Sequence, residues 1–381
     1  MRRCAELGAI SEEPGRLTRT FHSPAMQRAN ALVGAWMRAA GLEVREDPAF
    51  NLIGRWKCAA RQARTLLLGS HLDTVRDAGK YDGPLGVLVA LAAVEQLRST
   101  GVTLPFHLEV IGFSDEEGVR YQTTYLGSRA LAGTLTRSDL ALVAEKGIER
   151  ARRRASELLA YAEVHIEQGP ILEAADLALG VVSGIAGQSR ISVRFTGRAG
   201  HAGTTPMSMR RDALGAAAEF ILAVERCGIV ATVGQIRVEP GASNVIPGRA
   251  ELSLDIRHLS DARRRAAVAR LRLRARKIAS SRGVAVSWKT VQATASVCCD
   301  RRLRKLLTRV VAKQERKVLT LPSGAGHDAA AMSAVCPVAM LFVRCKGGLS
   351  HHPAESVKAT DVAKAVAALR DFVLLLKESH A

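Results

Sequence analysis

Short apolar runs with strand character alternate with longer amphipathic runs along most of the 381 residues. Apolar side chains recur at helical spacing from residue 23 to residue 40, and Gly41 ends that run. Strand-like runs follow at 51–56 and 65–68, then a helical run at 85–98 and a strand-like run at 107–113. This alternation predicts an α/β fold in which helices flank a mixed sheet.

The pattern changes between residues 187 and 297, where it reads β-α-β-β-α-β. This order is typical of a ferredoxin-like α+β domain, which has one four-stranded sheet and two helices. After Cys299 the first pattern resumes and ends in a helix at 360–377. We therefore expect residues 1–187 and 299–381 to form one domain and residues 188–298 to form an inserted one. The expected elements of the insertion are 189–195, 211–226, 231–238, 250–258, 261–281 and 284–290.

The chain is strongly basic, with a formal net charge of +19. Much of the excess lies in two arginine-rich stretches, 150–154 and 263–277, and we expect both to be helical. Only 4% of the residues are aromatic, whereas stacking on nucleic-acid bases needs aromatic side chains beside the cations. Solvated helix faces are therefore favoured, and nucleic-acid binding is kept only as a remote alternative.

Targeting and redox signals are weak. The seven cysteines have no CxxC spacing, the N-terminal segment contains acidic residues, and no eighteen apolar residues run together. These features predict no disulfide framework, no signal peptide and no membrane span. We therefore expect a cytoplasmic protein.

Histidines and carboxylates gather where the expected strands end. In an open α/β sheet such positions meet at one edge, which is where sites are usually built. Two of the motifs, HLD and HIE, place a histidine and a carboxylate two residues apart on an extended segment. The set comprises His71, Asp73, Asp82, the three carboxylates at 115–117, His165, Glu167, His351 and His352.

Each member also has a structural explanation. Asp82 precedes a helix and suits an N-cap, the three adjacent carboxylates suit a solvated loop, and the two histidines before Pro353 suit a turn. Taken together, the set favours a metal centre. Imidazole and carboxylate ligands suit Zn or Mn, with Co or Ni also possible, and the number of ligands suits two ions.

The motifs HLDT, YDGPLG, DEEG, HIEQGP, GHAGTTP, SNVIPG, SGAGHDA and GLSHHPAE resemble those of metallopeptidase family M20. They resemble most its ureido-cleaving branch of allantoate and N-carbamoyl-L-amino-acid amidohydrolases. The resemblance implies two divalent metal ions, with Asp82 as the bridge, Glu116 as the general base, and Asp73 orienting His71. The implied terminal ligands are His71, Glu117 or His165, and His351. His352 stands where many relatives have Asn, and we keep His351 because it matches the histidine of the motif.

The resemblance also implies a homodimer and a small ureido or carboxylate substrate. Gln168, Asn244, Arg257 and the backbone near Gly324 would bind that substrate, and His201 would reach it from the partner chain. Structural explanations stay open, because Arg257 can pair with Asp255 or Glu251 and Asn244 lies in a turn sequence.

The implied activity is hydrolysis of a ureido C–N bond by a metal-activated water, with release of ammonia and CO2. Allantoate is slightly favoured over N-carbamoyl-L-amino acids, because YDGPLGV and EEGVRYQTTYLGSRALAG are most similar to allantoate amidohydrolases. An aminoacylase or dipeptidase of the same family is the alternative.

Overall fold

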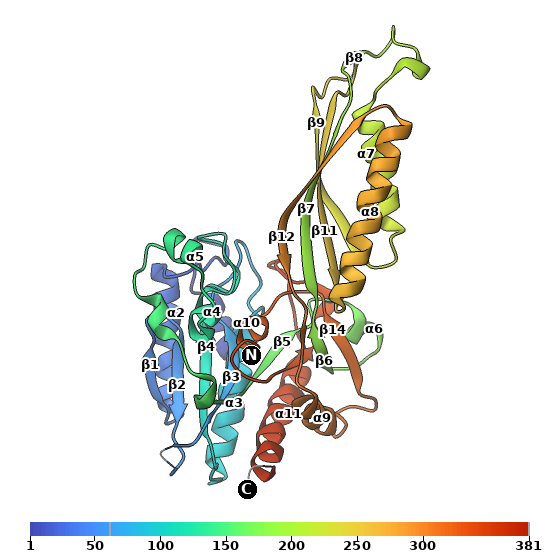
Figure 1. The fold of residues 1–381 in the computed structure, drawn as a ribbon. Coiled ribbons are helices and arrows are strands. Elements are labelled where there is room, and N and C mark those ends of the chain that lie inside the picture. Colours follow the sequence, from blue (N-terminus) through green and yellow to red (C-terminus); the bar gives the residue numbers. More distant parts are fainter. Residues whose placement is uncertain (61, 380–381) are drawn as a thin grey trace. The chain divides into compact units, whose positions relative to one another are not determined.

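The computed structural model describes residues 1–60 and 62–379 (Figure 1). The chain forms two compact units, one made of Met1–Gly184 and Cys298–Ala381 and the other of Ile185–Val297. The second unit is thus inserted between two halves of the first. The catalytic and dimerisation roles expected for these units stay predictions.

A nine-stranded sheet forms the centre of the first unit, in the order β1-β2-β4-β3-β5-β15-β6-β13, with β14 paired to β6. Pairs β3–β4, β3–β5 and β5–β15 are parallel, whereas β1–β2, β2–β4 and β6–β15 are antiparallel, so the sheet is mixed. Its strands are β1 (Glu43–Glu46), β2 (Leu52–Trp56), β3 (Thr65–His71), β4 (His107–Phe113), β5 (Leu158–Ile166), β6 (Leu179–Ile185), β13 (Val297–Cys298), β14 (Leu319–Ser323) and β15 (Val338–Val343).

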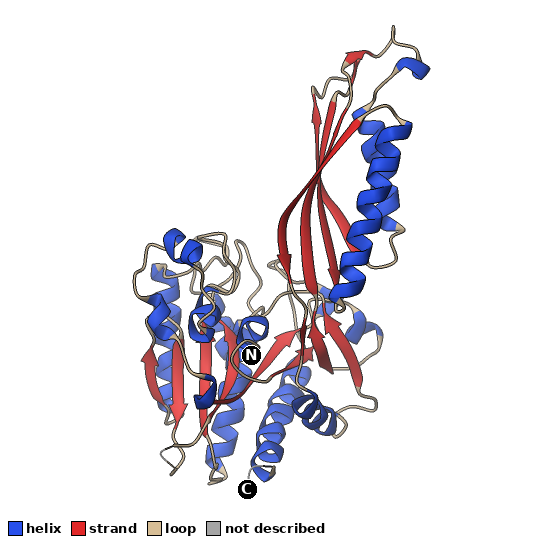
Figure 2. Ribbon diagram, viewed as in Figure 1, coloured by secondary structure: helices blue, strands red, loops and turns tan. Residues whose placement is uncertain are grey.

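Helices cover this sheet (Figure 2) and pack against it through apolar side chains. The largest core joins alternate residues of β3, β4, β5 and β15 to α2, α3, α9 and α11. Strand β3 is buried along its whole length, as its continuous apolar run predicts for a parallel strand covered on both faces. The helices of this unit are α1 (Arg2–Gly8), α2 (Pro24–Ala39), α3 (Pro84–Ser99), α4 (Leu126–Ala132), α5 (Arg137–Leu142), α6 (Ile171–Ala174), α9 (Arg301–Val311), α10 (Asp328–Met332) and α11 (Ala359–Glu378).

The inserted unit has a four-stranded antiparallel sheet in the order β12-β7-β11-β9. This is the order of a ferredoxin-like fold, with both helices on one face of the sheet (Figure 2). A short ribbon of β8 and β10 extends from it. The elements are β7 (Gly187–Thr196), β8 (Gly200–His201), α7 (Ala213–Glu225), β9 (Val230–Glu239), β10 (Val245–Ile246), β11 (Arg249–His258), α8 (Asp261–Ser281) and β12 (Ala285–Thr294).

The predicted fold class is confirmed, and the bounds of α8 agree with the expected helix. One expectation was wrong. Residues 150–154 do not form a helix, and only a single 3-10 turn, Ile148–Ala151, overlaps them. The Arg153 side chain instead forms ion pairs with Glu109 and Glu157. No helix within the described residues has both the length and the apolar character needed to cross a membrane.

The inserted unit has its own core, in which Phe220 of α7 is fully buried against Phe195 and Trp288. Replacing Phe220 by Ala is expected to lower the free energy of unfolding of this unit by about 3–5 kcal/mol, because a large cavity is left. Leu222→Ala on the same helix is the control, since Leu222 is 50% exposed. Scanning calorimetry that shows equal transitions for both variants would contradict this packing.

Candidate metal centre

Three parallel strands bring the first candidate residues to one edge of the large sheet. His71 is the last residue of β3, His165 lies near the end of β5, and the loop after β4 carries Glu116 and Glu117. Neighbouring parallel strands end at the same edge, so these side chains meet. Asp82 reaches them from the turn before α3, where Gly83 is the N-cap residue.

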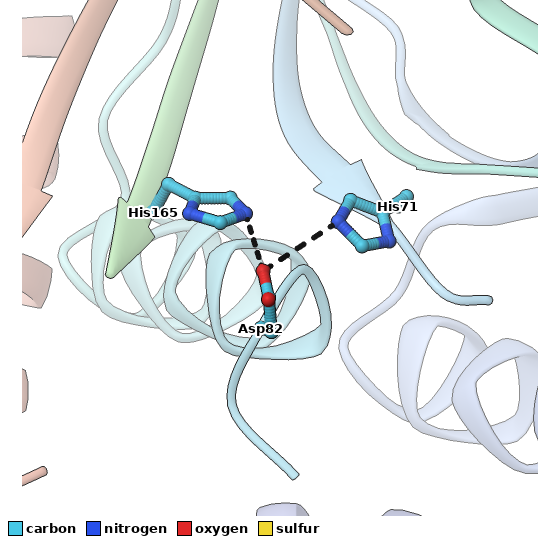
Figure 3. Close-up of side chains that lie close together, drawn as sticks. All are labelled: His71, Asp82 and His165. Carbon is cyan, nitrogen blue, oxygen red and sulfur yellow. Dashed lines mark ion pairs between the residues drawn. The ribbon is translucent and has the colours of Figure 1, made fainter. Parts of the chain in front are cut away.

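His71, Asp82 and His165 form the first candidate ligand group. All three are buried, and the Nε2 atoms of His165 and His71 lie 3.0 and 4.0 Å from Asp82 Oδ1 (Figure 3). His71 Nδ1 lies 3.0 Å from the carbonyl oxygen of Asp73, and His165 Nδ1 lies 2.9 Å from its neighbour's carbonyl oxygen. A carbonyl oxygen only accepts, so each Nδ1 carries a proton and each Nε2 points toward Asp82.

Asp82, Glu117 and His351 form a second candidate group. His351 Nε2 lies 3.1 Å from Asp82 Oδ2 and 3.3 Å from Glu117 Oε1. The two oxygens of Asp82 thus face different groups, Oδ1 the first and Oδ2 the second. His165 also belongs to a candidate group with Glu163 and His327, and Glu117 also belongs to one with His71 and Glu116.

The donor set fits cations. Asp82 Oδ1 is buried and accepts no hydrogen bond from any described residue, although two imidazole nitrogens face it. Burial alone lowers the pKa of His71, but Asp73, Glu116 and Glu117 outweigh it and raise this pKa well above its usual value. The surroundings therefore require positive charge, which either extra protons or metal ions can supply. Imidazole and carboxylate donors without a thiolate are those that Zn, Mn, Co and Ni accept.

His351 and His352 are placed differently. His351 faces Asp82 and Glu117, and hydrogen bonds with these two carboxylates raise its pKa to about 10. His352 is exposed, and its Nδ1 accepts a hydrogen bond from the backbone N–H of Ala354 at 3.1 Å. The structure therefore brings only His351 into a candidate ligand group.

We expect His351→Ala to lose one of two metal equivalents and His352→Ala to keep both, because only His351 belongs to a ligand group. Metal content after dialysis, measured by plasma mass spectrometry, checks this. The reverse order of loss would show that the neighbouring histidine is the ligand.

Glu116 and Glu117 are held in place by Asp73. The Asp73 carboxylate accepts hydrogen bonds from the backbone N–H groups of Glu116 at 3.0 Å and Glu117 at 3.1 Å. Its Oδ1 also lies 3.5 Å from His71 Nδ1. Burial raises the pKa of Glu116 well above its usual value, the charge of His71 opposes this rise, and that of Glu117 adds to it. A raised pKa makes a carboxylate a stronger base, which suits general base catalysis.

Gln168 also lies at the centre. Its Nε2 donates to Asp82 Oδ2 at 2.9 Å and to the Ser350 hydroxyl at 3.2 Å. Gly324, by contrast, lies in an exposed loop after β14, and no atom of the described residues, its chain neighbours aside, lies within 4 Å of where its Cβ would be.

The remaining expected substrate residues lie in the inserted unit, at its two ends. His201 pairs with Val245, and the carbonyl oxygen of Asn244 accepts from the N–H of Ala202, so His201 and Asn244 are neighbours beyond the Arg249 end of β11. Arg257 lies at the other end of β11, about 27 Å away along the strand. Its guanidinium makes two 3.0 Å hydrogen bonds to Asp255, the pairing that a structural role predicts.

Several buried polar residues near the centre had no role assigned from the sequence. Glu163 accepts hydrogen bonds from the Ser70 hydroxyl at 2.8 Å and the N–H of Ala329 at 3.0 Å. The ring of His327 packs edge-on against His165, with 4.5 Å between centroids. A charged residue inside the apolar run 158–166 was the available signal for Glu163. His327 and Asp328 lie in the motif SGAGHDA, and Glu355 lies in the motif GLSHHPAE, so these two motifs were the available sequence signals for them.

Comparisons with known proteins agree with this arrangement. The model of the family described as Peptidase family M20/M25/M40 matches residues 67–375. A probable allantoate deiminase of Oryza sativa subsp. japonica is 41% identical and aligns with 97% of this chain and 87% of its own. An N-carbamoyl-L-amino acid amidohydrolase of Geobacillus stearothermophilus is 40% identical, and the alignment covers 93% of this chain and 92% of that protein.

Solved structures show the same fold. An amidase of the hydantoinase/carbamoylase family from Burkholderia multivorans is 30% identical and superposes with a TM-score of 0.92, over 99% of this chain and 96% of its own. The chain therefore belongs to peptidase family M20/M25/M40, in the branch of allantoate deiminases and N-carbamoyl-L-amino acid amidohydrolases.

Proposed function

We propose that the chain is a binuclear metal-dependent amidohydrolase that cleaves the C–N bond of a ureido compound and releases ammonia and CO2. The observation that best supports this proposal is that Asp82 belongs to two candidate ligand groups. One buried carboxylate presents Oδ1 to two histidines and Oδ2 to a third histidine beside Glu117. A carboxylate between two ligand groups is what a site for two neighbouring metal ions requires.

His71, Asp82 and His165 would hold one ion, and Asp82, Glu117 and His351 the other. Two divalent cations, when bound, supply Lewis acidity that polarises a carbonyl group and lowers the pKa of water toward about 7. Glu116 belongs to the same cluster and is 7% exposed, so it can take a proton from water and return it to the leaving nitrogen. Asp73 holds the backbone of Glu116 in place for this transfer.

The net reaction adds one water across the ureido group. The hydroxyl oxygen bonds to the carbonyl carbon, the C–N bond breaks, and the leaving nitrogen gains the proton. The carbamic acid that remains then breaks down to CO2 and an amine. Allantoate and N-carbamoyl-L-amino acids both fit this chemistry, and we favour allantoate slightly, on the similarity of the YDGPLGV and EEGVRYQTTYLGSRALAG segments.

Binding of the substrate would use Gln168 at the centre, His201, Asn244 and Arg257 from inserted units, and the backbone near Gly324. Arg257 suits a carboxylate, since a guanidinium donates two parallel hydrogen bonds. Asp255 holds this guanidinium and keeps it oriented. His201 would face the oxygen that gains negative charge during attack.

A homodimer is part of the proposal. His201 and Asn244 lie near one end of β11 and Arg257 at the other, a separation much longer than a ureido acid. Residues of a single chain therefore cannot all contact one such substrate, whereas two chains related by a twofold axis can contribute opposite ends. This separation supports His201 acting across a subunit interface.

Mixing inactive variants tests the shared site. When His201→Ala and Glu116→Gln chains are combined at random, activity is expected to recover to about a quarter of wild type, because half the dimers carry one complete site out of two. Each variant refolded alone serves as the control. If the mixture stays as inactive as the separate variants, each site is complete within one chain.

The activity itself is tested by measuring ammonia release from the metal-loaded protein. Allantoate and N-carbamoyl-L-amino acids should release ammonia, and the faster of them identifies the substrate class. Dipeptides and N-acyl amino acids release an amino acid and no ammonia, so their cleavage is followed by the appearance of a free amino group. Faster cleavage of these would identify the alternative, an aminoacylase or dipeptidase.

A further inference from the structure

Glu355 joins the two loops that carry Asp82 and His351. It lies in the same loop as His351 and is 4% exposed. Its Oε1 accepts hydrogen bonds from two backbone N–H groups of the other loop, Tyr81 at 2.8 Å and Asp82 at 3.0 Å. One carboxylate oxygen thus binds the two successive N–H groups on either side of the Tyr81 Cα.

The other oxygen of Glu355 is linked to the side chain of Asp82. The Ser350 hydroxyl lies 3.2 Å from Glu355 Oε2 and also makes a short hydrogen bond to Asp82 Oδ2. Asp82 Oδ2 is the oxygen that faces His351. Glu355 therefore accepts a hydrogen bond from the backbone N–H of Asp82 and lies next to the Ser350 hydroxyl, whose one proton is shared between the two carboxylates.

The space that Glu355 fills is made by a glycine. A Cβ on Gly79 would lie 2.4 Å from Glu355 Cβ and 2.5 Å from Glu355 Oε1, distances that exclude any side chain there. The backbone of Glu355 is fixed as well, since its N–H donates to the carbonyl oxygen of His352 at 3.0 Å. The two loops are thus shaped to receive this carboxylate.

We propose that Glu355 is a positioning residue that sets the relative placement of Asp82 and His351, and so selectively determines metal affinity at the group formed by Asp82, Glu117 and His351. This inference rests on the proposed metal function. The first group shares Asp82, but its two histidines lie on strands β3 and β5, and none of the hydrogen bonds described above for Glu355 reaches them. The second group depends on the loop of His351, which Glu355 ties to Asp82.

The test is a titration of the metal-free full chain with Co²⁺, followed by visible d–d absorption and by calorimetry. Wild type should bind two equivalents. Glu355→Ala should bind the first equivalent normally and the second about 10–100-fold more weakly, as expected for the loss of an outer-shell partner. Glu355→Gln keeps an oxygen for the two N–H groups and an amide beside Ser350, so it should restore the second equivalent.

Two further variants separate positioning from folding. Ser350→Ala removes only the hydroxyl between the two carboxylates and should weaken the same equivalent by a smaller factor. Asp361→Ala removes another buried carboxylate, one that pairs with Arg344 and belongs to none of the ligand groups among the described residues, and should leave the titration unchanged.

Four outcomes are decisive. Selective weakening of the second equivalent in Glu355→Ala, with recovery in Glu355→Gln, supports the inference. Wild-type binding of both equivalents by Glu355→Ala, or equal weakening of both, overturns it. If wild type itself binds fewer than two equivalents, the metal proposal fails instead.

Discussion

Replacing Glu116 by Gln is expected to lower kcat by about 10²–10⁴-fold while both metal equivalents remain bound. The amide has the size of the carboxylate but cannot take up a proton from water at neutral pH. The backbone N–H of Glu116 still donates to Asp73, so the loop should keep its shape. Ammonia release and metal content, measured on the same sample, separate these effects.

Glu117→Gln is the matched control, because it changes the adjacent residue, which is also held by Asp73. Glu117 contacts His351 at 3.3 Å, so this variant should lose affinity for one metal equivalent. The base assignment is contradicted if Glu116→Gln retains activity, or if it loses metal as Glu117→Gln does.

Replacing Asp82 by Ala is expected to abolish binding of both metal equivalents, and activity with it. Asp82 is the member common to both ligand groups, and its carboxylate oxygens lie 3.0 Å from His165 Nε2 and 3.1 Å from His351 Nε2. No other described residue belongs to both of these groups. Metal content and ammonia release give the readout.

Asp82→Asn separates charge from packing. Asn keeps the size of the side chain and one oxygen but has no negative charge. We expect it to stay folded, with an unchanged circular dichroism spectrum, and to bind both equivalents more weakly than wild type. Tight binding of two equivalents by Asp82→Asn would show that Asp82 is not the bridge.

Much of the fold follows from patterns that are local in sequence. The apolar run 66–68, the helical spacing of apolar side chains from 23 to 40, and the β-α-β-β-α-β order of the insertion each identify a part of the fold directly. The helix expected at residues 150–154 does not form, because a contact between distant segments outweighs the local pattern. Arginine has good helix propensity, but here Arg153 pairs with Glu109 of β4, a contact between distant segments.

The candidate site was predictable as a set but not in its grouping. Strand ends of a parallel sheet meet at one edge, so His71, His165 and the carboxylates after β4 were expected together. Which oxygen of Asp82 faces which histidine depends on loop conformation. The same is true of Glu355, whose partners Tyr81 and Asp82 lie more than 270 residues away in the sequence.

Anomalous diffraction from crystals of the Zn²⁺-loaded protein tests the central claim most directly. The account predicts two peaks on either side of the Asp82 carboxylate, with ligand distances of about 2.0–2.2 Å. His71 and His165 should contact one peak, and Glu117 and His351 the other. A single peak, no peak, or ions held instead by Glu163 and His327 would contradict it.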